Sequence, residues 1–347
     1  MPAPNVNGVN GVNRVSDNIH RILILRFSSL GDIVMATAMI RCLRARFPAA
    51  RIDMVVREDF LELIEHNPHL DLKMGLSRET GWRGLWRLYQ RLKHNDYDLI
   101  YDAHFSLRSR ILSGFLRPRL SAHYQKHYLR RSLALTFKIP LLKHFDRMVV
   151  RYIAPLERWG VAFDKKGPEL PCPPQTRLER PQIGFIPSAQ WPGKRWGQFT
   201  ELARLILEKT DWNITLFAGP GDGFASSIAR DLDPTRVHNL QGRLSLKETT
   251  VELKKCHLVI ANDTGLMHMA DALGVPPVVI LGPTAKELGC EPFHPLHRII
   301  EKTLWCRPCS KNGQAPCIRG RRVCLEIAPE VVLEEARHVV EQLKHAP

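Results

Sequence analysis

The chain has 347 residues, 44% of them hydrophobic and 7% aromatic, which is typical of a globular protein with two domains of ordinary size. Its 50 lysine and arginine residues against 35 aspartate and glutamate residues leave a net charge of +15, which favours an acidic ligand or surface. The sequence has no apolar run that would span a membrane and no secretory signal, so we expect a cytoplasmic protein.

Apolar runs alternate with helix-length segments in two series along the chain. Residues 1–18 precede them and have the composition of a disordered tail. The alternation predicts an α/β fold with two Rossmann-like, doubly wound domains, at 19–165 and 182–328. A proline-rich linker at 166–181 separates them. An amphipathic pattern predicts a C-terminal helix within 329–347, and we consider that this helix packs back on the N-terminal domain.

The first turn of the N-terminal series joins a strand predicted at Arg21–Phe27 to a helix predicted at Ile33–Phe47. Polar groups at the carboxyl end of a strand lie at the edge where open α/β sheets bind ligands. Asp32 in this turn is compatible both with a helix N-cap and with a ligand contact. The polar and flexible residues of the turn are Ser28, Ser29, Gly31 and Asp32.

Strands predicted at Arg51–Arg57 and Asp98–Asp102 continue the N-terminal series, and His104 and Arg108 follow the second of them. Residues 117–151 then carry many basic side chains among Leu, Phe and Tyr. This basic segment is a candidate surface for an anionic substrate or lipid headgroups. An ordinary solvated face has the same composition, so both interpretations stay open.

The C-terminal series begins with a strand predicted at Gln182–Ile186, followed by a turn of small residues that ends in a lysine. Such a turn before a helix favours a diphosphate, although the Walker A pattern is absent. A second turn, after a strand predicted at Asn213–Ala218, ends in Asp222, which suits ribose hydroxyls or a plain helix cap. The residues of interest in the first turn are Ser188, Ala189, Gln190 and Lys194.

Two apolar runs, Leu258–Ile260 and Val278–Leu281, flank a helix-length segment and predict a strand, a turn, a helix and a strand. The free N–H groups and the positive dipole at the start of this helix favour a phosphate. A plain helix cap fits the same residue types equally well. The residues at and after the turn are Asp263, Thr264, Gly265 and His268.

Eight cysteines in a chain of this length do not indicate a disulfide framework. Four of them crowd into a loop-rich segment with the spacing C-x2-C-x7-C-x6-C, namely Cys306, Cys309, Cys317 and Cys324. The second pair is spaced too widely for a strong zinc-ribbon match. A reduced structural loop and a structural metal site both fit this pattern.

Taken in order, these motifs resemble glycosyltransferase family 9, the lipopolysaccharide heptosyltransferases. The resemblance spans about Arg21 to Leu343, and the combination is more specific than any single motif. The matching pieces are Ile22–Asp32, Asp98–Ala103, the turn with Lys194 and Trp196, Asp263–His268, Gly282–Thr284, and the cysteine-bearing segment through Cys324-Leu325 and Pro329-Glu330.

The resemblance implies the GT-B architecture, in which two Rossmann-like domains face each other across a cleft. The N-terminal domain then takes the acceptor and the C-terminal domain takes the nucleotide-sugar donor. It also implies an inverting, metal-independent transfer of heptose from ADP-heptose, the co-substrate, to the Kdo/heptose inner core of lipopolysaccharide, with no cofactor. Asp32 is then the general base that takes the proton of the acceptor hydroxyl.

The resemblance further implies two sets of binding residues. The donor set is Ser188, Ala189, Gln190, Lys194, Asp222, Asp263, Thr264, Gly265 and His268, and the acceptor set is Ser28, Ser29, Gly31, Arg57, His104 and Arg108, with no metal ligands. The family often has hydroxyl residues where this chain has Ala189 and Gln190, so we expect fewer side-chain hydrogen bonds to the diphosphate.

The implied acceptor is a lipid-linked, acidic saccharide, which accounts for the charge of +15. We therefore expect peripheral attachment to the inner face of the inner membrane and no nucleic-acid partner, since no nucleic-acid-binding motif appears. Two alternatives stay open. One is a related transferase that uses another nucleotide sugar for surface polysaccharide, and the other is a noncatalytic nucleotide-sugar-binding protein, which has no need of Asp32.

Overall fold

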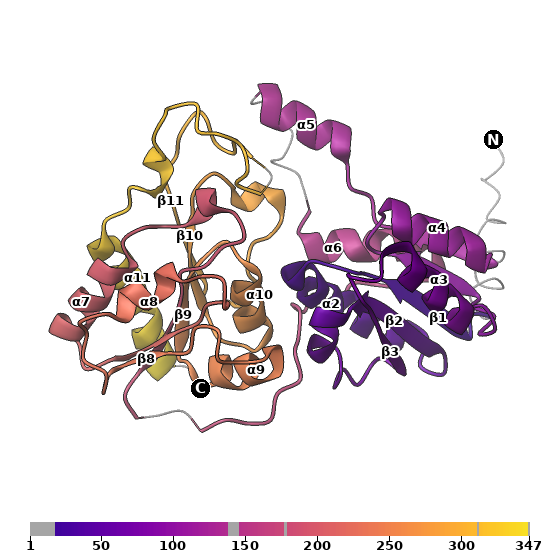
Figure 1. Cartoon of the computed structure of the whole chain (residues 1–347), viewed down its shortest axis with the longest axis horizontal. Helices are drawn as coiled ribbons and strands as arrows, with labels where there is room; N and C mark the ends of the chain where they lie inside the picture. Colours follow the sequence, from indigo (N-terminus) through magenta and orange to yellow (C-terminus); the bar gives the residue numbers. More distant parts are fainter. Residues whose placement is uncertain (1–17, 138–145, 177–178, 311, 346–347) are drawn as a thin grey trace, which may run out of the picture. The chain divides into compact units, whose positions relative to one another are not determined.

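The computed structural model describes residues 18–137, 146–176, 179–310 and 312–345 (Figure 1). Apart from Asn18, the predicted tail at 1–18 lies outside the described residues. Tertiary contacts divide the chain into two compact units. Unit 1 contains the chain up to Lys126 and residues 148–166, and unit 2 contains residues 127–147 and the chain from Gly167 onward. The described residues of the segment 127–147 therefore cluster with unit 2, whereas the sequence predicts them in the N-terminal domain.

Unit 1 is built on a five-stranded parallel sheet in the order β3-β2-β1-β4-β5. The order reverses between β1 and β4, and this kind of switch point is where open α/β sheets bind ligands. Ile22 to Leu25 are fully buried because β1 is central and covered on both faces. The strands are β1 (Arg21–Leu25), β2 (Arg51–Arg57), β3 (Leu72–Leu76), β4 (Leu99–Asp102) and β5 (Leu120–His123).

Two pairs of helices pack within unit 1. Helices α3 and α4 lie side by side (Figure 1) and share an apolar core with alternate residues of β1, such as Leu23 and Leu25. Helices α2 and α6 also pack against each other. The bounds are α2 (Leu30–Arg46), α3 (Gly81–Leu92), α4 (Leu107–Leu116) and α6 (Met148–Ile153), with the 3-10 helices η1 (Glu58–Leu63) and η2 (Ala154–Trp159).

Unit 2 is built on a six-stranded parallel sheet in the order β11-β10-β9-β6-β7-β8. The strands are β6 (Gln182–Ile186), β7 (Asn213–Leu216), β8 (Val237–Asn239), β9 (Leu258–Asn262), β10 (Pro277–Leu281) and β11 (Arg298–Glu301). The helices are α5 (Tyr128–Phe137), α7 (Phe199–Lys209), α8 (Phe224–Ala229), α9 (Leu246–Lys255), α10 (Gly265–Ala272) and α11 (Pro329–Lys344), with η3 (Pro192–Lys194), η4 (Lys286–Leu288) and η5 (Val323–Leu325). The predicted α/β class with two doubly wound parallel sheets is confirmed.

The C-terminal helix α11 packs within unit 2. Its apolar face, which includes Val332 and Val339, joins the core formed by β6, β9 and α7, and α11 lies beside α7 in Figure 1. The sequence analysis instead considers packing of this helix on the N-terminal domain. Its apolar face lies in the core of unit 2, where α11 and α7 cover the same face of the six-stranded sheet together.

None of the helices in the described part of the chain combines the length and the apolarity that crossing a bilayer requires.

Two adjacent valines test the role of α11. Val332 is fully buried in the core of unit 2, whereas Val331 is 49% exposed. Replacing Val332 by alanine should lower the free energy of unfolding by about 2 kcal/mol, because two methyl groups leave a close-packed core. The same change at Val331 should alter it by less than about 0.5 kcal/mol. Chemical denaturation of both variants measures the difference, and equal effects would contradict this packing.

Candidate active site

The first turn of unit 1 is organised around the carboxylate of Asp32. Helix α2 begins at Leu30, so Ser29 is its N-cap and Asp32 stands in its first turn. The Oδ2 atom of Asp32 accepts hydrogen bonds from the Ser29 backbone N–H at 3.2 Å and from the Ser29 hydroxyl at 2.8 Å. The carboxylate therefore supports the helix start. Ser28 is half-buried and Gly31 is buried in the same turn.

Two residues outside the predicted site hold Asp32 from other elements. The guanidinium of Arg26, directly after β1, forms an ion pair with Asp32 Oδ2 at 2.6 Å and donates to the carbonyl of Ala103 at 2.5 Å. The hydroxyl of Tyr152, on α6, donates to Asp32 Oδ1 at 3.1 Å. Arg26 could have been found in the sequence, because it is a charged residue near the end of the apolar run 22–27. Nothing in the sequence singles out Tyr152.

These contacts keep the Asp32 carboxyl group ionised. Burial alone would raise its pKa, but the Arg26 guanidinium and the hydrogen bonds from Ser29 and Tyr152 outweigh burial and hold the pKa well below its ordinary value. The Arg26 side chain is 7% exposed and the Asp32 side chain 25% exposed. The carboxylate is thus fixed in position and still open to a ligand.

His104 lies at the same sheet edge and is neutral. It follows β4, where the buried carboxylate of Asp102 accepts hydrogen bonds from the backbone N–H groups of His104 and Phe105. Burial, followed by the charges of Arg26 and Lys126, lowers the pKa of His104 to about 4. Its Nδ1 atom is buried and has no hydrogen-bond partner among the described residues. His104 is therefore a neutral, half-buried imidazole at the carboxyl edge, and its Nδ1 atom is enclosed by the protein.

The two predicted acceptor arginines stand apart from Asp32. Arg57 ends β2, forms an ion pair with Asp59 at 2.8 Å and stacks over the ring of Phe60. Arg108 is exposed in the first turn of α4. The structure therefore joins Ser29 to Asp32 and leaves the two arginines at or near the carboxyl edge, without a hydrogen bond to Asp32 in the described part of the chain.

Lys194 is the centre of the polar edge of unit 2. It ends the short helix η3 after β6, and its Nζ atom forms an ion pair with Asp263 Oδ2 at 2.7 Å. The Thr284 hydroxyl donates to the same oxygen at 2.8 Å. The neighbouring strands β6, β9 and β10 bring these three residues together. Burial would raise the pKa of Asp263, but Lys194 and these hydrogen bonds lower it below its ordinary value.

A small cavity of about 60 Å³ adjoins the Lys194–Asp263 pair and is also lined by Lys286, Cys290 and Glu291. Helix α10 begins two residues after Asp263. Its N-cap residue, Thr264, makes no side-chain cap hydrogen bond, so the first backbone N–H groups of α10, from Gly265 onward, lack that partner. His268, one turn further, is buried. Two lysines and two carboxylates thus border this small space, and the start of α10 follows Asp263 in the chain.

Arg195 contacts two of the remaining predicted donor residues, Ala189 and Asp222. It donates to the carbonyl of Ala189 at 3.0 Å and pairs with Asp222 at 3.2 Å, so the turns after β6 and β7 are joined. Ser188 is buried, and its hydroxyl has no hydrogen-bond partner among the described residues. Gln190 is exposed.

Asn262 is a further residue that sequence analysis missed. It is fully buried at the end of β9, donates to the carbonyl of Pro187 at 2.6 Å and accepts from the backbone N–H of Trp196 at 3.0 Å. It therefore fixes both ends of the turn that carries Lys194. An amide at the end of a continuous apolar strand was the available signal.

The cysteine-bearing segment packs on the turns of this edge. Arg307 donates to the carbonyls of Gly282 and Thr284 and pairs with Glu301 at 2.8 Å. Gly313 has a φ of +81°, and a Cβ atom there would meet Lys194 Cγ at 2.7 Å, so the segment restricts the lysine directly. None of the eight cysteines, all of which are among the described residues, forms a disulfide. Across the described ranges, no group of three or more His, Cys, Asp or Glu side chains is placed to hold a metal ion.

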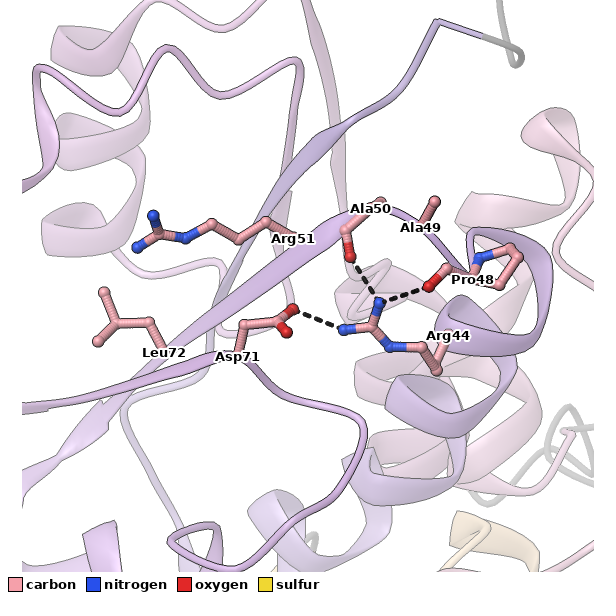
Figure 2. Close-up of a pocket in the computed structure, with 7 residues that line it drawn as sticks. All are labelled: Arg44, Pro48, Ala49, Ala50, Arg51, Asp71 and Leu72. Atoms are coloured by element: carbon pink, nitrogen blue, oxygen red, sulfur yellow. Dashed lines mark hydrogen bonds and ion pairs between the residues drawn. The ribbon is translucent and has the colours of Figure 1, made fainter.

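A larger depression of unit 1 lies at the opposite edge of the sheet. Its volume is about 490 Å³, and its lining includes Arg51 and Leu72, the first residues of β2 and β3. Figure 2 shows the guanidinium of Arg44 directed at Asp71 and at the carbonyls of Pro48 and Ala50. These bonds tie α2 to the sheet. Because ligands of such folds bind at the carboxyl ends of the strands, we assign this depression no part in the reaction.

Two doubly wound parallel sheets, each with charged side chains gathered at its carboxyl edge, are the architecture of the GT-B class. The chain belongs to glycosyltransferase family 9 (heptosyltransferase), whose family model matches residues 85–317.

Individual relatives agree with this assignment. The chain is 27% identical to lipopolysaccharide heptosyltransferase 2 of Escherichia coli K12 over 91% of its own length and 97% of that protein. In structure it is similar to a family 9 glycosyl transferase from Veillonella parvula, with a TM-score of 0.75 at 20% identity, covering 93% of this chain and 98% of that one. It is also similar to E. coli ADP-heptose lps heptosyltransferase II, with a TM-score of 0.74 at 24% identity, covering 93% and 99%.

Replacing Asp32 by asparagine tests the ion pair through stability. Arg26 would stay buried without its anion, so the free energy of unfolding at pH 7 should fall by about 3 kcal/mol. Because the pKa of Asp32 is lowered in the folded state, its contribution is complete above the ordinary value of 3.8 and declines only as the pH falls below it.

Denaturation of wild type and Asp32→Asn should thus give a constant difference between about pH 7 and 5 that shrinks in more acidic solution. Asp96→Asn, at an exposed position, is the control and should have little effect. A difference that is absent at pH 7, or that grows as the pH falls, would contradict the described pair.

Proposed function

We propose that the protein transfers a heptosyl group from ADP-heptose to a hydroxyl of the Kdo/heptose inner core of lipopolysaccharide, with inversion at the anomeric carbon and without a metal ion. The observation that carries this proposal is the ionised, fixed and partly exposed carboxylate of Asp32 at the carboxyl edge of unit 1. Family membership and the names of the relatives, a lipopolysaccharide heptosyltransferase and an ADP-heptose lps heptosyltransferase, supply the substrates.

In the proposed reaction, the acceptor hydroxyl oxygen forms a bond to the anomeric carbon of the heptose from the face opposite the diphosphate. The bond between that carbon and the β-phosphate oxygen breaks, and its electron pair leaves with ADP. The hydroxyl proton passes to Asp32 as the oxygen becomes positive. Arg26 and Tyr152 hold the carboxylate in one orientation, so the base is in place before the substrate arrives.

Unit 2 takes the donor. The leaving diphosphate gains negative charge, and Lys194 together with the N–H groups at the start of α10 stabilises it. The Asp263 carboxylate neutralises Lys194 while no donor is bound, so the lysine exchanges one anion for another when ADP-heptose enters. Ser188, Ala189 and Gln190 line the diphosphate, and Asp222 meets the ribose. His268, Thr264 and Gly265 complete the donor site.

The acceptor is a lipid-linked, acidic saccharide. Arg57 and Arg108 supply positive charge near the carboxyl edge, the neutral ring of His104 offers a hydrogen bond, and Ser28, Ser29 and Gly31 border Asp32. The net charge of +15 suits such an acceptor. We accordingly place the protein in the cytoplasm, peripherally attached to the inner face of the inner membrane, with no nucleic-acid partner.

The test of the reaction is sugar transfer to a truncated, lipid-linked core acceptor from ADP-heptose, with UDP-glucose and UDP-N-acetylglucosamine in parallel. We expect transfer from ADP-heptose only. Asp32→Ala should reduce kcat by a factor of at least about 10², because the acceptor loses its base, while ADP binding measured by calorimetry stays unchanged. Asp211→Ala, at an exposed position, is the control. Transfer from a UDP-sugar alone would overturn the donor, and a fully active Asp32→Ala variant would overturn the mechanism.

Lys194 is tested by a double substitution. Lys194→Ala should weaken ADP binding at least about tenfold, because a cation is lost and the buried Asp263 carboxylate remains to repel the diphosphate. Adding Asp263→Asn removes that repulsion, so the double variant should bind ADP more tightly than Lys194→Ala alone. Lys209→Ala, on the exposed end of α7, is the control. Identical affinities of the single and the double variant would disprove the exchange of anions at Lys194.

A further inference from the structure

Helices α3 and α4 of unit 1 expose an aromatic strip, which we define as Trp82, Trp86, Tyr89 and Phe115. Trp82 and Trp86 are one helical turn apart on α3 and are 58% and 55% exposed, and Phe115 on α4 is 57% exposed. The ring of Tyr89 lies 5.1 Å from that of Trp86 and 5.8 Å from that of Phe115, so the strip continues from one helix to the other.

The core of unit 1 does not require the exposed rings of this strip. Leu85, Leu88 and Leu92 of α3, with Leu112 of α4, are buried and fill the layer above β1. The two tryptophans stand on the outer side of the same helix. Monomeric proteins rarely expose large aromatic side chains in a continuous group unless the group meets a partner.

The charges around the strip define the chemistry of that partner. Helices α3 and α4 carry five arginines and no acidic residue. All five are exposed, namely Arg83, Arg87, Arg91, Arg108 and Arg110. Positive charge beside tryptophan and phenylalanine is the composition of a surface that lies in the headgroup region of an anionic membrane, where the indole ring is partly buried and arginine meets phosphate.

We propose that the α3–α4 surface is the membrane-docking face of this protein and that its occupant is the surface of an anionic phospholipid bilayer. This inference rests on the proposed function, in which the acceptor is anchored in a membrane. The aromatic strip enters the interface, and Arg83, Arg87, Arg91 and Arg110 contact lipid phosphates.

The position of the surface suits that role. Helix α4 begins at Leu107, directly after the turn of Asp102 and His104 at the carboxyl edge, and α3 begins shortly after β3 ends at the same edge. Leu107 itself is 66% exposed. A membrane against α3 and α4 would therefore lie next to the edge that carries Asp32, where the sugar of a lipid-anchored acceptor must arrive.

The experiment is cosedimentation of the full chain with vesicles of phosphatidylcholine alone and of phosphatidylcholine with phosphatidylglycerol. Wild type should bind only the anionic vesicles. Trp82→Ala/Trp86→Ala and Arg83→Glu/Arg87→Glu should each lower the partition coefficient by a factor of about ten or more. The matched controls are Trp305→Ala, an exposed tryptophan of unit 2, and Arg204→Glu/Lys247→Glu, and these should bind like wild type.

A second readout separates this inference from the proposed reaction. Transfer to a deacylated, water-soluble core acceptor should be the same in wild type and in Trp82→Ala/Trp86→Ala, which also shows that the variant is folded. If wild type fails to transfer heptose but binds anionic vesicles through the strip, the proposed reaction is wrong and the docking surface stands.

Three results would overturn the docking surface. The first is equal vesicle binding by wild type and both α3 variants. The second is loss of binding in Leu129→Ser/Phe137→Ser instead, since α5 exposes these apolar residues at 82% and 65%. The third is absence of vesicle binding in wild type together with dimers in light scattering that Trp82→Ala/Trp86→Ala converts to monomers, which would make the strip a contact between two copies of the chain.

Discussion

The ion pair between Arg26 and Asp32 is the interaction on which the rest of the site in unit 1 depends. A guanidinium that is 7% exposed requires an anion nearby, and the cation in turn offsets the burial that would raise the pKa of the carboxyl group. The two residues are joined because β1 ends beside the first turn of α2. Tyr152 and Ser29 complete the hydrogen bonds of the carboxylate, so it has one orientation and one charge state before any substrate binds.

In unit 2 the central charged group is a lysine, Lys194, and its partner is the carboxylate of Asp263. Under the proposed function Lys194 receives a diphosphate, and Asp263 balances its charge when the site holds no anion. Asn262 fixes the turn that carries Lys194, and Arg195 joins that turn to the one after β7. Gly313 of the cysteine-bearing segment lies against the Lys194 side chain and restricts it. Both units therefore hold a charged side chain in a preorganised ion pair at the carboxyl edge of a parallel sheet. Under the proposed function, Asp32 is the base and Lys194 the binding cation.

Much of the fold could be predicted from the sequence because central parallel strands are continuous apolar runs. The strand predicted at Gln182–Ile186 has the same bounds as β6, and all its residues are buried. Edge strands such as β11 (Arg298–Glu301) are only half-buried, so the sequence contains no continuous apolar run for them. The turns that hold Asp32, Lys194 and Asp263 could be predicted from their polar residues. Their partners could not, because Tyr152 and Thr284 reach the site only through tertiary folding. The packing of α11 in unit 2 could not be predicted either, because an apolar stripe on a helix does not specify which surface covers it.

The measurement that tests the central claim most directly is the pH dependence of kcat/KM for heptosyl transfer in wild type, Arg26→Lys and Arg26→Gln. The account predicts that Asp32 stays ionised in wild type, so no loss of activity from this group appears between about pH 5 and 8. Arg26→Lys keeps a cation and should behave similarly. In Arg26→Gln, burial raises the pKa of Asp32 and only the hydrogen bonds from Ser29 and Tyr152 still lower it, so the loss of activity on acidification should begin at a higher pH than in wild type. Superimposable acid limbs in wild type and Arg26→Gln would contradict the account.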